Sequence, residues 1–192
     1  EIGSGLVGSE MCIRDSPQPL IYKQMLTVYF AGGCFWGTQH YFKQIKGVVN
    51  TCVGYANSTI PHPTYHEVCT GMTMAAEGVE VQYDPAVVSL EFLIELYFKS
   101  IDPTSLNRQG GDKGTQYRTG IYYTNAEQQH IIIDTVNRLA KDYDRPVVVE
   151  IMQLKNFYPA EEYHQDYLDK NPDGYCHIHP ELFELARKAN MQ

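Results

Sequence analysis

The sequence lacks the features that identify several classes of protein. Its Lys and Arg residues form no long run, and the formal net charge of -8 disfavours a nucleic-acid partner. No stretch approaches the ~18 consecutive apolar residues of a membrane span, so no membrane partner is expected. Five cysteines are too few and too irregularly spaced for a secreted disulfide scaffold. A reducing, cytoplasmic setting is therefore expected, in which a cysteine is a packing residue, a metal ligand or a catalyst.

Residues 1–24 do not read like the rest of the chain. They show no sustained hydrophobic period, and they have neither the basic start nor the apolar middle of a signal peptide. The run "GLVGSEMCIRDS", which contains Cys12, resembles translated cloning sequence. We interpret residues 1–24 as a non-native or disordered leader, and residues 25–192 as a single domain with a C-terminal tail.

Strand and helix signals alternate along residues 25–192. Short apolar or alternating runs predict strands at "LTVYFA", "VVNTCVGY", "EGVEVQYD", "YRTGIYY" and "PVVVEIM". Helical spacing predicts helices from Phe35 to Gly47, over residues 89–101, after "TNAE", and over residues 159–168. Ser89 is a predicted N-cap, Thr124 and Glu127 a predicted capping box, and Pro159 a predicted first-turn residue.

The order strand, helix, strand, strand, helix, strand, helix, strand predicts an α+β fold. Helices packed against strands in such an order form a two-layer α/β sandwich with a mixed central sheet, a ferredoxin-like core. The tail after Leu168 is rich in loop-forming residues and is expected to be mobile.

The stretch "FAGGCFWG" places Cys34 among glycines, directly before Phe35 and Trp36. Cys34 falls where a predicted strand meets a predicted helix, and the free N–H groups of a helix start favour a thiolate over a thiol. Gly32 and Gly33 allow a sharp turn and leave space for a substrate. These features predict a reactive cysteine beside an apolar surface.

Five stretches resemble, in order, those of the peptide methionine sulfoxide reductase A family. They are "GCFWG", "HPTYHEVCTG", "AAEGVEVQYDP", "GDKGTQYRTGIYY" and "NPDGYCHIHP", and they extend over residues 26–180. The resemblance implies an oxidoreductase that reduces the S epimer of methionine sulfoxide, free or in proteins. It also implies that residues 25–192 are a catalytic domain, which we expect to act as a monomer.

The resemblance implies a role for each of four residues in the reduction of the sulfoxide. Cys34 would attack the sulfur and become a sulfenic acid as methionine departs. Glu77, kept protonated by apolar surroundings, would donate a proton to the sulfoxide oxygen. Tyr65 and Tyr117 would hold that oxygen through their hydroxyl groups.

Three further residues are implied in binding the substrate. Phe35 and Trp36 would form the wall of a pocket for the S-methyl group. Asp112 would position the substrate, through its backbone N–H. No metal or organic cofactor is required, because thiols supply the electrons.

Cys176 matches the family's resolving thiol. It would attack the Cys34 sulfenic acid and form a disulfide that thioredoxin or a similar dithiol reductant reopens. Cys52 and Cys69 are interpreted as structural, because a buried cysteine commonly behaves as a small hydrophobe.

The sequence departs from the family pattern in a few places. Ala75 stands where the family often has a histidine, which leaves the surroundings of Glu77 open. His62 replaces an asparagine before "PTY", and "ANST" replaces a Gly-Gly pair after Tyr55. Both of these changes fall in predicted loops.

Three other functions are compatible with the residues taken singly. A zinc module could draw on Cys52, His62, His66, Cys69, Cys176, His177 and His179, although their spacing fits no familiar zinc pattern. A thiol peroxidase or Cys–His hydrolase could use Cys34 with His40 or His164 as base, although His40 is expected on another helix face. A binding protein for oxidised methionine would keep the site without turnover.

Overall fold

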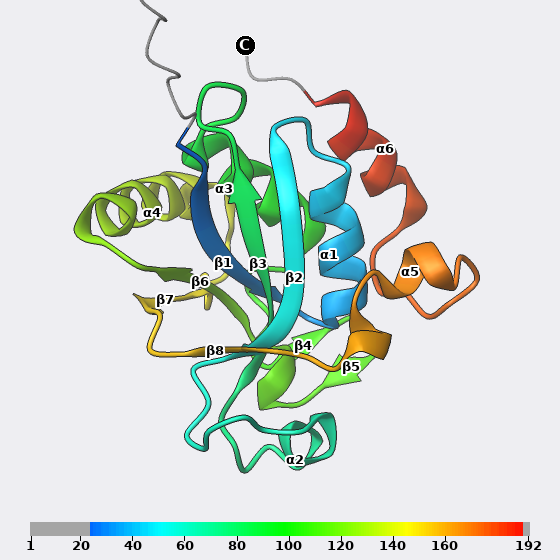
Figure 1. Ribbon diagram of the computed structural model, residues 1–192. Helices are drawn as coiled ribbons and strands as arrows, with labels where there is room; N and C mark the ends of the chain where they lie inside the picture. The colour runs from blue at the N-terminus through cyan, green and yellow to red at the C-terminus, as the bar shows by residue number, and fades with distance from the viewer. Residues whose placement is uncertain (1–23, 190–192) are drawn as a thin grey trace, which may run out of the picture.

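The computed structural model describes residues 24–189, so residues 1–23 of the leader predicted over residues 1–24, with Cys12, lie outside the described residues. Within the described range a six-stranded sheet has the order β7-β6-β1-β3-β2-β8 (Figure 1). Its strands are β1 (Leu26–Gly32), β2 (Val48–Ala56), β3 (Ala76–Tyr83), β6 (Thr119–Tyr123), β7 (Glu150–Gln153) and β8 (Phe157–Pro159). Only the β6–β7 pair of this sheet is parallel, and the predicted mixed sheet is confirmed.

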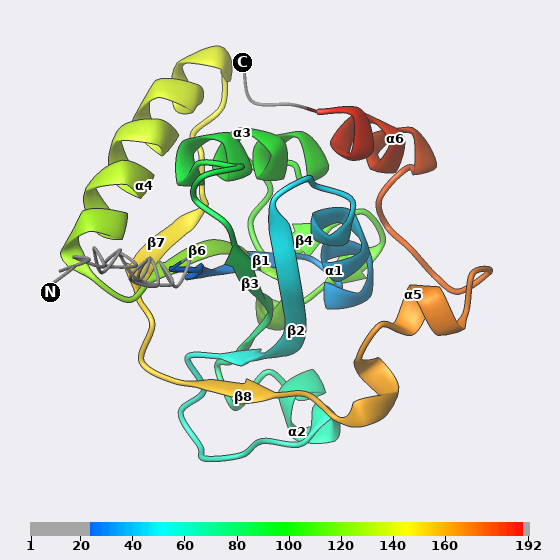
Figure 2. The same ribbon diagram turned by 45° about the horizontal axis from the view of Figure 1, so that its top comes forward.

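Apart from short elements, the chain from β1 to β7 follows the predicted order of strand, helix, strand, strand, helix, strand, helix and strand. Helix α1 (Phe35–Lys43) joins β1 to β2, and α3 (Leu90–Ser100) lies between β3 and β6. The remaining elements are α2 (Tyr65–Cys69), the hairpin β4 (Arg108–Gln109) and β5 (Asp112–Lys113), α4 (Ala126–Leu139), α5 (Tyr167–Lys170) and α6 (Pro180–Lys188). Figure 2 shows α1, α3 and α4 beside the sheet, with α6 near α1. No helix in this described part of the chain is both long and apolar enough to cross a membrane.

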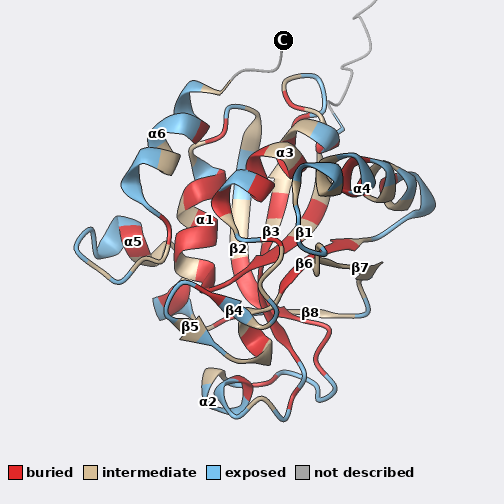
Figure 3. Cartoon of the chain, turned by 180° about the vertical axis from the view of Figure 1, so that it is seen from behind, coloured by how far each residue is buried: buried red, intermediate tan, exposed pale blue. Residues whose placement is uncertain are grey.

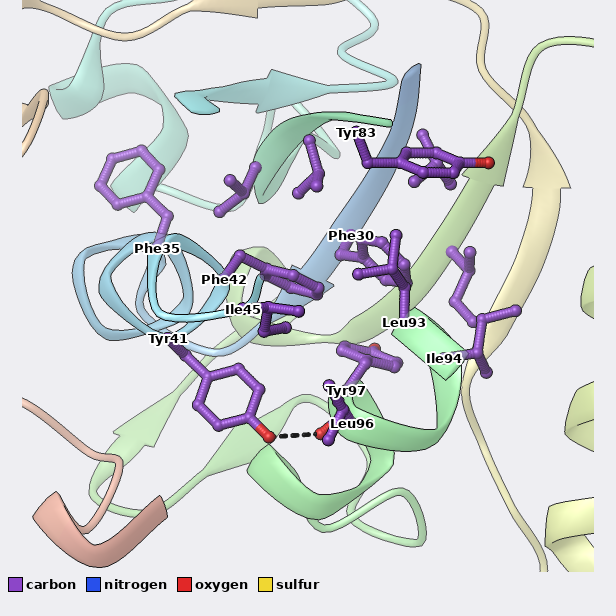
Figure 4. Close-up of a cluster of buried hydrophobic side chains, with 14 of the residues drawn as sticks. Phe30, Phe35, Tyr41, Phe42, Ile45, Tyr83, Leu93, Ile94, Leu96 and Tyr97 are labelled. Carbon is purple, nitrogen blue, oxygen red and sulfur yellow. Dashed lines mark hydrogen bonds between the residues drawn. The ribbon is translucent and has the colours of Figure 1, made fainter. Parts of the chain in front are cut away.

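The main core lies between the sheet and helices α1, α3 and α4. Phe30 of β1 stacks on Phe42 of α1 with ring centroids 4.6 Å apart, and Tyr97 of α3 lies 5.0 Å from Phe30. The Tyr41 hydroxyl donates to the Leu96 carbonyl at 2.8 Å (Figure 4). Burial of each such side chain contributes roughly 1.5–3 kcal/mol, so these contacts hold α1, and with it Cys34, firmly on the sheet.

The opposite face of the sheet carries a second, smaller cluster. Its buried members are Ala31, Ala56, Ala76 and Tyr122. Figure 3 shows the central strands β1, β3 and β6 and much of α1 buried, whereas β7 and β8 are mainly intermediate and much of α2 and the outer sides of α4 and α6 are exposed. This arrangement of one helical layer on one sheet confirms the predicted two-layer α+β fold.

The structure corrects three local predictions. Residues 159–168 do not form one helix: Pro159 ends β8, a 3-10 turn covers Glu162–His164, and α5 begins at Tyr167. The left-handed backbone of Asp166, with φ of 52°, separates the last two elements. The N-cap of α4 is Asn125, which accepts from the Gln128 N–H at 2.9 Å, so the capping box predicted at Thr124 is wrong by one position.

Two further differences concern the end of the chain. The run "PVVVEIM" is only half-buried, and β7 begins at Glu150 rather than at Pro146. The tail contains α6, which sequence reasoning missed although Pro180 opens it as a first-turn proline. The described tail therefore combines loop with one amphipathic helix.

Candidate active site

Cys34 is the N-cap residue of α1, in the turn that follows β1. Gly33 has φ of 84°, and a Cβ at this position would lie 2.7 Å from the Gln109 side chain. Glycine is therefore required both for the left-handed turn and for the close approach of the β4–β5 hairpin. Cys34 is 8% exposed. The predicted place of this cysteine, where a strand meets a helix, is confirmed.

Glu77 lies opposite Tyr55 in the β2–β3 ladder and is 1% exposed. Its carboxyl group accepts a hydrogen bond from the Phe35 N–H at 3.1 Å, which places it against the first turn of α1, next to Cys34. Burial raises the pKa of Glu77 to about 8, although this hydrogen bond acts in the opposite direction. The carboxyl group is therefore mostly protonated at pH 7, the form that a proton donor needs.

The charge state of Cys34 differs from the prediction. Burial, followed by the nearby Glu77 carboxyl, raises the pKa of the Cys34 thiol well above its ordinary value. A backbone hydrogen bond from Trp36 lowers that pKa, as a helix start should, but its effect is smaller. The prediction of a thiolate in the free protein is thus wrong, because desolvation of the sulfur outweighs the helix N-terminus.

Tyr65 and Tyr117 reach the site from two separate segments. Tyr65 begins α2, and Tyr117 ends the 3-10 turn Thr115–Tyr117. Burial is the main cause that raises the pKa of both phenols, and the charge of Glu77 adds to it in each case. Cys34 also acts on Tyr117. The structure therefore brings both predicted tyrosines close enough to interact with Glu77, and Tyr117 close enough to interact with Cys34 as well; both phenols keep their protons.

Asp112 approaches the same site on the β4–β5 hairpin. It pairs with Gln109 across the hairpin, and its carboxylate accepts a hydrogen bond from the Tyr175 hydroxyl at 3.1 Å. Its charge acts on both Cys34 and Glu77. The side chain of Asp112 therefore contacts the C-terminal tail, and the role of its backbone N–H toward a substrate stays a prediction.

The side chains of Phe35 and Trp36 differ in exposure and in their contacts. Phe35 is 1% exposed and lies within the core, with its ring 5.9 Å from Tyr55. Trp36 is half-buried and stacks on Tyr167, with ring centroids 3.7 Å apart and an interplanar angle of 12°. Its indole N–H donates to Nδ1 of His164 at 2.9 Å. Trp36 is thus held in one orientation and offers the accessible apolar surface of the pair.

Two residues of the segment that follows β8 make contacts at the site that the sequence did not predict, although His164 was considered as a base. Glu161 accepts hydrogen bonds from the Tyr55 hydroxyl at 2.7 Å and from the Tyr65 N–H at 2.8 Å. His164 is 1% exposed, and its Nδ1 is occupied by Trp36, which argues against His164 as a base for Cys34. The run "PAEEYHQDYL" could have indicated these contacts, because its mixture of aromatic and polar residues is compatible with a packed turn as well as with a surface helix.

Cys176 lies between α5 and α6 as a half-buried thiol. Its Sγ accepts from the Ile178 N–H at 3.4 Å, and it faces α1, since a Cβ at Gly37 would lie 3.0 Å from this sulfur. Gly37 follows Cys34 by three positions, so the Cys34 and Cys176 thiols lie over the same side of the first helical turn. Cys176 also acts electrostatically on Cys34. The structure thus brings the predicted resolving thiol beside Cys34, with both cysteines reduced.

The other two described cysteines are less buried than predicted. Cys52 is half-buried on β2, and Cys69 is exposed at the end of α2. The thiol of Cys69 is hydrogen-bonded to the Tyr65 hydroxyl. Neither is fully buried, because β2 turns this part of its surface outward and α2 lies on the outside of the molecule; their structural role stays a prediction.

The remaining alternatives find little support in the geometry. Among residues 24–189, no group of three or more His, Cys, Asp or Glu side chains is placed to hold a metal ion. His40 is bonded to Asp169 at 3.1 Å and contacts the edge of Phe183, as expected for a residue on another face of α1. Ala75, at the position where the family often has a histidine, is 2% exposed. Its methyl group offers Glu77 no polar partner.

Comparison with known proteins assigns the chain to a family. The family model described as peptide methionine sulfoxide reductase matches residues 26–192. The chain is 56% identical over 163 residues to a peptide methionine sulfoxide reductase MsrA from Lachnoclostridium phytofermentans, covering 85% of this chain and 98% of that protein. It is also 56% identical over 154 residues to an MsrA from Mycoplasma genitalium, covering 80% of this chain and 98% of that protein.

Solved structures give the same assignment. Reduced Mxr1 from Saccharomyces cerevisiae is 37% identical with a TM-score of 0.77, covering 81% of this chain and 92% of that chain. Methionine sulfoxide reductase A of Corynebacterium diphtheriae is 39% identical with a TM-score of 0.77, covering 83% of this chain and 79% of that chain. Mxr1 in complex with Trx2 is 25% identical with a TM-score of 0.56, covering 75% of this chain and 85% of that chain. With a buried thiol, a protonated carboxyl and two phenols in one place, the chain belongs to the peptide methionine sulfoxide reductase family.

Proposed function

We propose that the protein reduces methionine sulfoxide, free or in proteins, to methionine, with thiols as the source of electrons. The observation that carries this proposal is the pairing of Cys34 with Glu77 at the start of α1. The Phe35 N–H holds the carboxyl group at 3.1 Å, and burial keeps that group protonated. A sulfoxide has an electrophilic sulfur and a basic oxygen, so a nucleophile and an acid side by side match both atoms.

The first half of the reaction oxidises Cys34. Its sulfur attacks the sulfoxide sulfur while Glu77 protonates the oxygen and the hydroxyls of Tyr65 and Tyr117 donate to it. The S–O bond of the substrate breaks and the oxygen passes to Cys34 Sγ; the bond formed between the two sulfur atoms breaks as methionine leaves, and Cys34 remains as a sulfenic acid. Because Cys34 starts as a thiol, its proton passes to the Glu77 carboxylate and restores the acid. No net proton is consumed in this step.

The substrate binds against the aromatic wall of the site. Trp36 offers an apolar surface for the S-methyl group, held in place by Tyr167 and His164. With the oxygen held by the phenols and the methyl group against the indole, one epimer at sulfur places its lone pair away from Cys34. We infer that this is the S epimer, with Asp112 positioning the rest of the substrate.

The second half regenerates the thiols. Cys176 attacks the sulfenic acid, and the resulting Cys34–Cys176 disulfide is reopened by thioredoxin or a similar dithiol. The solved complex of the relative Mxr1 with Trx2 supports such a partner. A cytoplasmic setting fits a cycle that depends on reduced thiols. The shared core, which runs from β1 to α6, supports a single catalytic domain.

The direct test offers the R and S sulfoxides of one small peptide separately, with dithiothreitol as reductant. We expect methionine-containing product from the S epimer only, with many products formed per enzyme. Product from the R epimer would refute the assignment of the epimer. Peroxide consumption that outpaces sulfoxide reduction would support a thiol peroxidase, and binding without product would support a binding protein.

A further inference from the structure

The imidazole of His177 enters the turn that carries the nucleophile. Its Nε2 lies 2.9 Å from the carbonyl oxygen of Gly32, two residues before Cys34. A carbonyl only accepts, so Nε2 carries the hydrogen of this bond. Burial lowers the pKa of His177, which keeps the ring neutral at pH 7 and leaves Nδ1 without a proton. His177, the residue after Cys176, is thereby hydrogen-bonded to β1, the strand that precedes Cys34.

Three glycines make the space that this ring occupies. A Cβ at Gly33 would lie 2.9 Å from Nε2, a Cβ at Gly37 3.2 Å from Nδ1, and a Cβ at Gly110 3.3 Å from the Cβ of His177. The β1–α1 turn, the first turn of α1 and the β4–β5 hairpin thus enclose the ring on three sides. The Cγ of Gln109 completes this wall, since it too approaches the Gly33 position, at 3.2 Å.

The same contacts place the Cys176 thiol. Its sulfur lies 3.0 Å from the Cβ position of Gly37, on the helix face that Nδ1 of His177 also touches. On the preceding side, Tyr175 bonds to Asp112 at 3.1 Å. Nδ1 itself is buried without a hydrogen-bond partner.

We propose that His177 is a positioning residue for the resolving step: its ring, bonded to Gly32, holds the Cys176 thiol over the first turn of α1 within reach of the Cys34 sulfenic acid. This inference rests on the proposed function. In the step concerned, Cys176 Sγ attacks Cys34 Sγ, the S–S bond forms and the S–O bond of the sulfenic acid breaks. The thiol proton leaves with the hydroxyl group as water, so atoms and electrons balance.

The experiment separates the two halves of the cycle in three variants. His177→Ala removes the ring, His177→Gln keeps an N–H donor near the Nε2 position, and His179→Ala is the control. His179 is exposed in the same tail and makes no side-chain cap to α6. Each protein receives excess S-sulfoxide peptide without reductant, and methionine release, free thiols and sulfenic acid trapped by dimedone are followed over time.

We expect His177→Ala to release its first methionine at the wild-type rate but to form the disulfide about ten-fold more slowly, the size expected from a lost buried hydrogen bond. The trapped sulfenic acid should rise accordingly, and thioredoxin-supported turnover should fall. Turnover with dithiothreitol should hold, because this small dithiol reduces the Cys34 sulfenic acid directly. His177→Gln should regain most of the rate, and His179→Ala should match the wild type.

Two results would overturn the inference. One is disulfide formation at the wild-type rate in both His177 variants. The other is an equal loss of the first methionine and of dithiothreitol-supported turnover, which would show that His177 merely supports the whole site. A wild-type protein that releases no methionine would instead refute the proposed function. Methionine release shows this outcome, whereas the loss of free thiols reports disulfide formation.

Discussion

The two thiols of the proposed cycle are held in different ways. Cys34 is 8% exposed, between a strand and a helix that the main core packs together. Cys176 is half-buried in residues 171–179, which form neither helix nor strand, and its neighbours Tyr175 and His177 each make one hydrogen bond to the site. A nucleophile that must meet a substrate in one geometry is held by backbone and core. A thiol that must move to form an S–S bond is held by separate contacts that can be released.

The most severe change on the Cys34 side is Cys34→Ser. We expect this near-isosteric variant to lose turnover completely with either reductant, because a serine hydroxyl cannot take up the oxygen as a sulfenic acid does. Product from the S-sulfoxide peptide measures this, with thermal unfolding as a control for folding. Residual turnover would transfer the role to another thiol, and Cys34→Ser combined with Cys69→Ser would identify it.

The matching change on the Cys176 side is Cys176→Ser. The variant should release about one methionine per enzyme and then stop with thioredoxin as the only reductant, because no disulfide can form. Dithiothreitol should restore turnover. Rapid-quench counting of methionine against enzyme concentration measures the difference. Sustained turnover with thioredoxin would remove Cys176 from the scheme and with it the contrast between the two thiols.

The next largest loss of activity is expected from replacing Glu77, the acid beside Cys34. Glu77→Gln should lower kcat/KM by about 10²–10⁴-fold, the usual contribution of a general acid. Because burial raises the pKa of Glu77 to about 8, wild-type kcat/KM should also fall as the pH rises above 8, where the acid loses its proton. The variant should lack this fall. A wild-type profile that is flat through pH 8 would contradict the assignment of Glu77 as proton donor.

The same variant tests the stability of the site. A carboxyl with a folded pKa of about 8 and an ordinary value of 4.5 binds its proton more tightly in the folded state. Its contribution to stability is present below pH 4.5 and is lost as the pH rises through 8. The free energy of unfolding of Glu77→Gln, from denaturant titrations at pH 5 and pH 8, should therefore fall less with pH than that of the wild type. An identical dependence in both proteins would mean that Glu77 does not carry this proton.

The smallest expected effect comes from Gly37→Ala, which leaves the Cys34 side unchanged. The new Cβ would lie 3.0 Å from the Cys176 sulfur, so the tail must shift at a cost of ~1 kcal/mol, about five-fold in the rate of disulfide formation. Alanine also favours the helix, so thermal stability should not fall. The first methionine should appear at the wild-type rate. Unchanged disulfide formation would show that the tail adapts to the extra methyl group without loss.

Local patterns in the chain predicted most of the layer that supports Cys34. The alternation in "LTVYFA", the helical spacing after Phe35 and the Ser89 cap all correspond to observed elements, because each depends on neighbours within one or two turns. Residues 159–168 show the limit of such patterns. Their aromatic and polar side chains suit a helix locally, yet Glu161 and His164 take their partners from β2, α2 and α1.

The sequence by itself determined the alternating order of strands and helices from β1 to β7, the place of Cys34 at a helix start and, through resemblance, the set of residues that gather there. The tertiary structure decided the protonation states of the site residues and the position of the C-terminal tail. Burial keeps both Cys34 and Glu77 protonated, and the space left by Gly33, Gly37 and Gly110 receives His177. The reason is physical: hydrophobic period and capping are local properties, whereas desolvation and the fit of a ring depend on segments brought together only by folding.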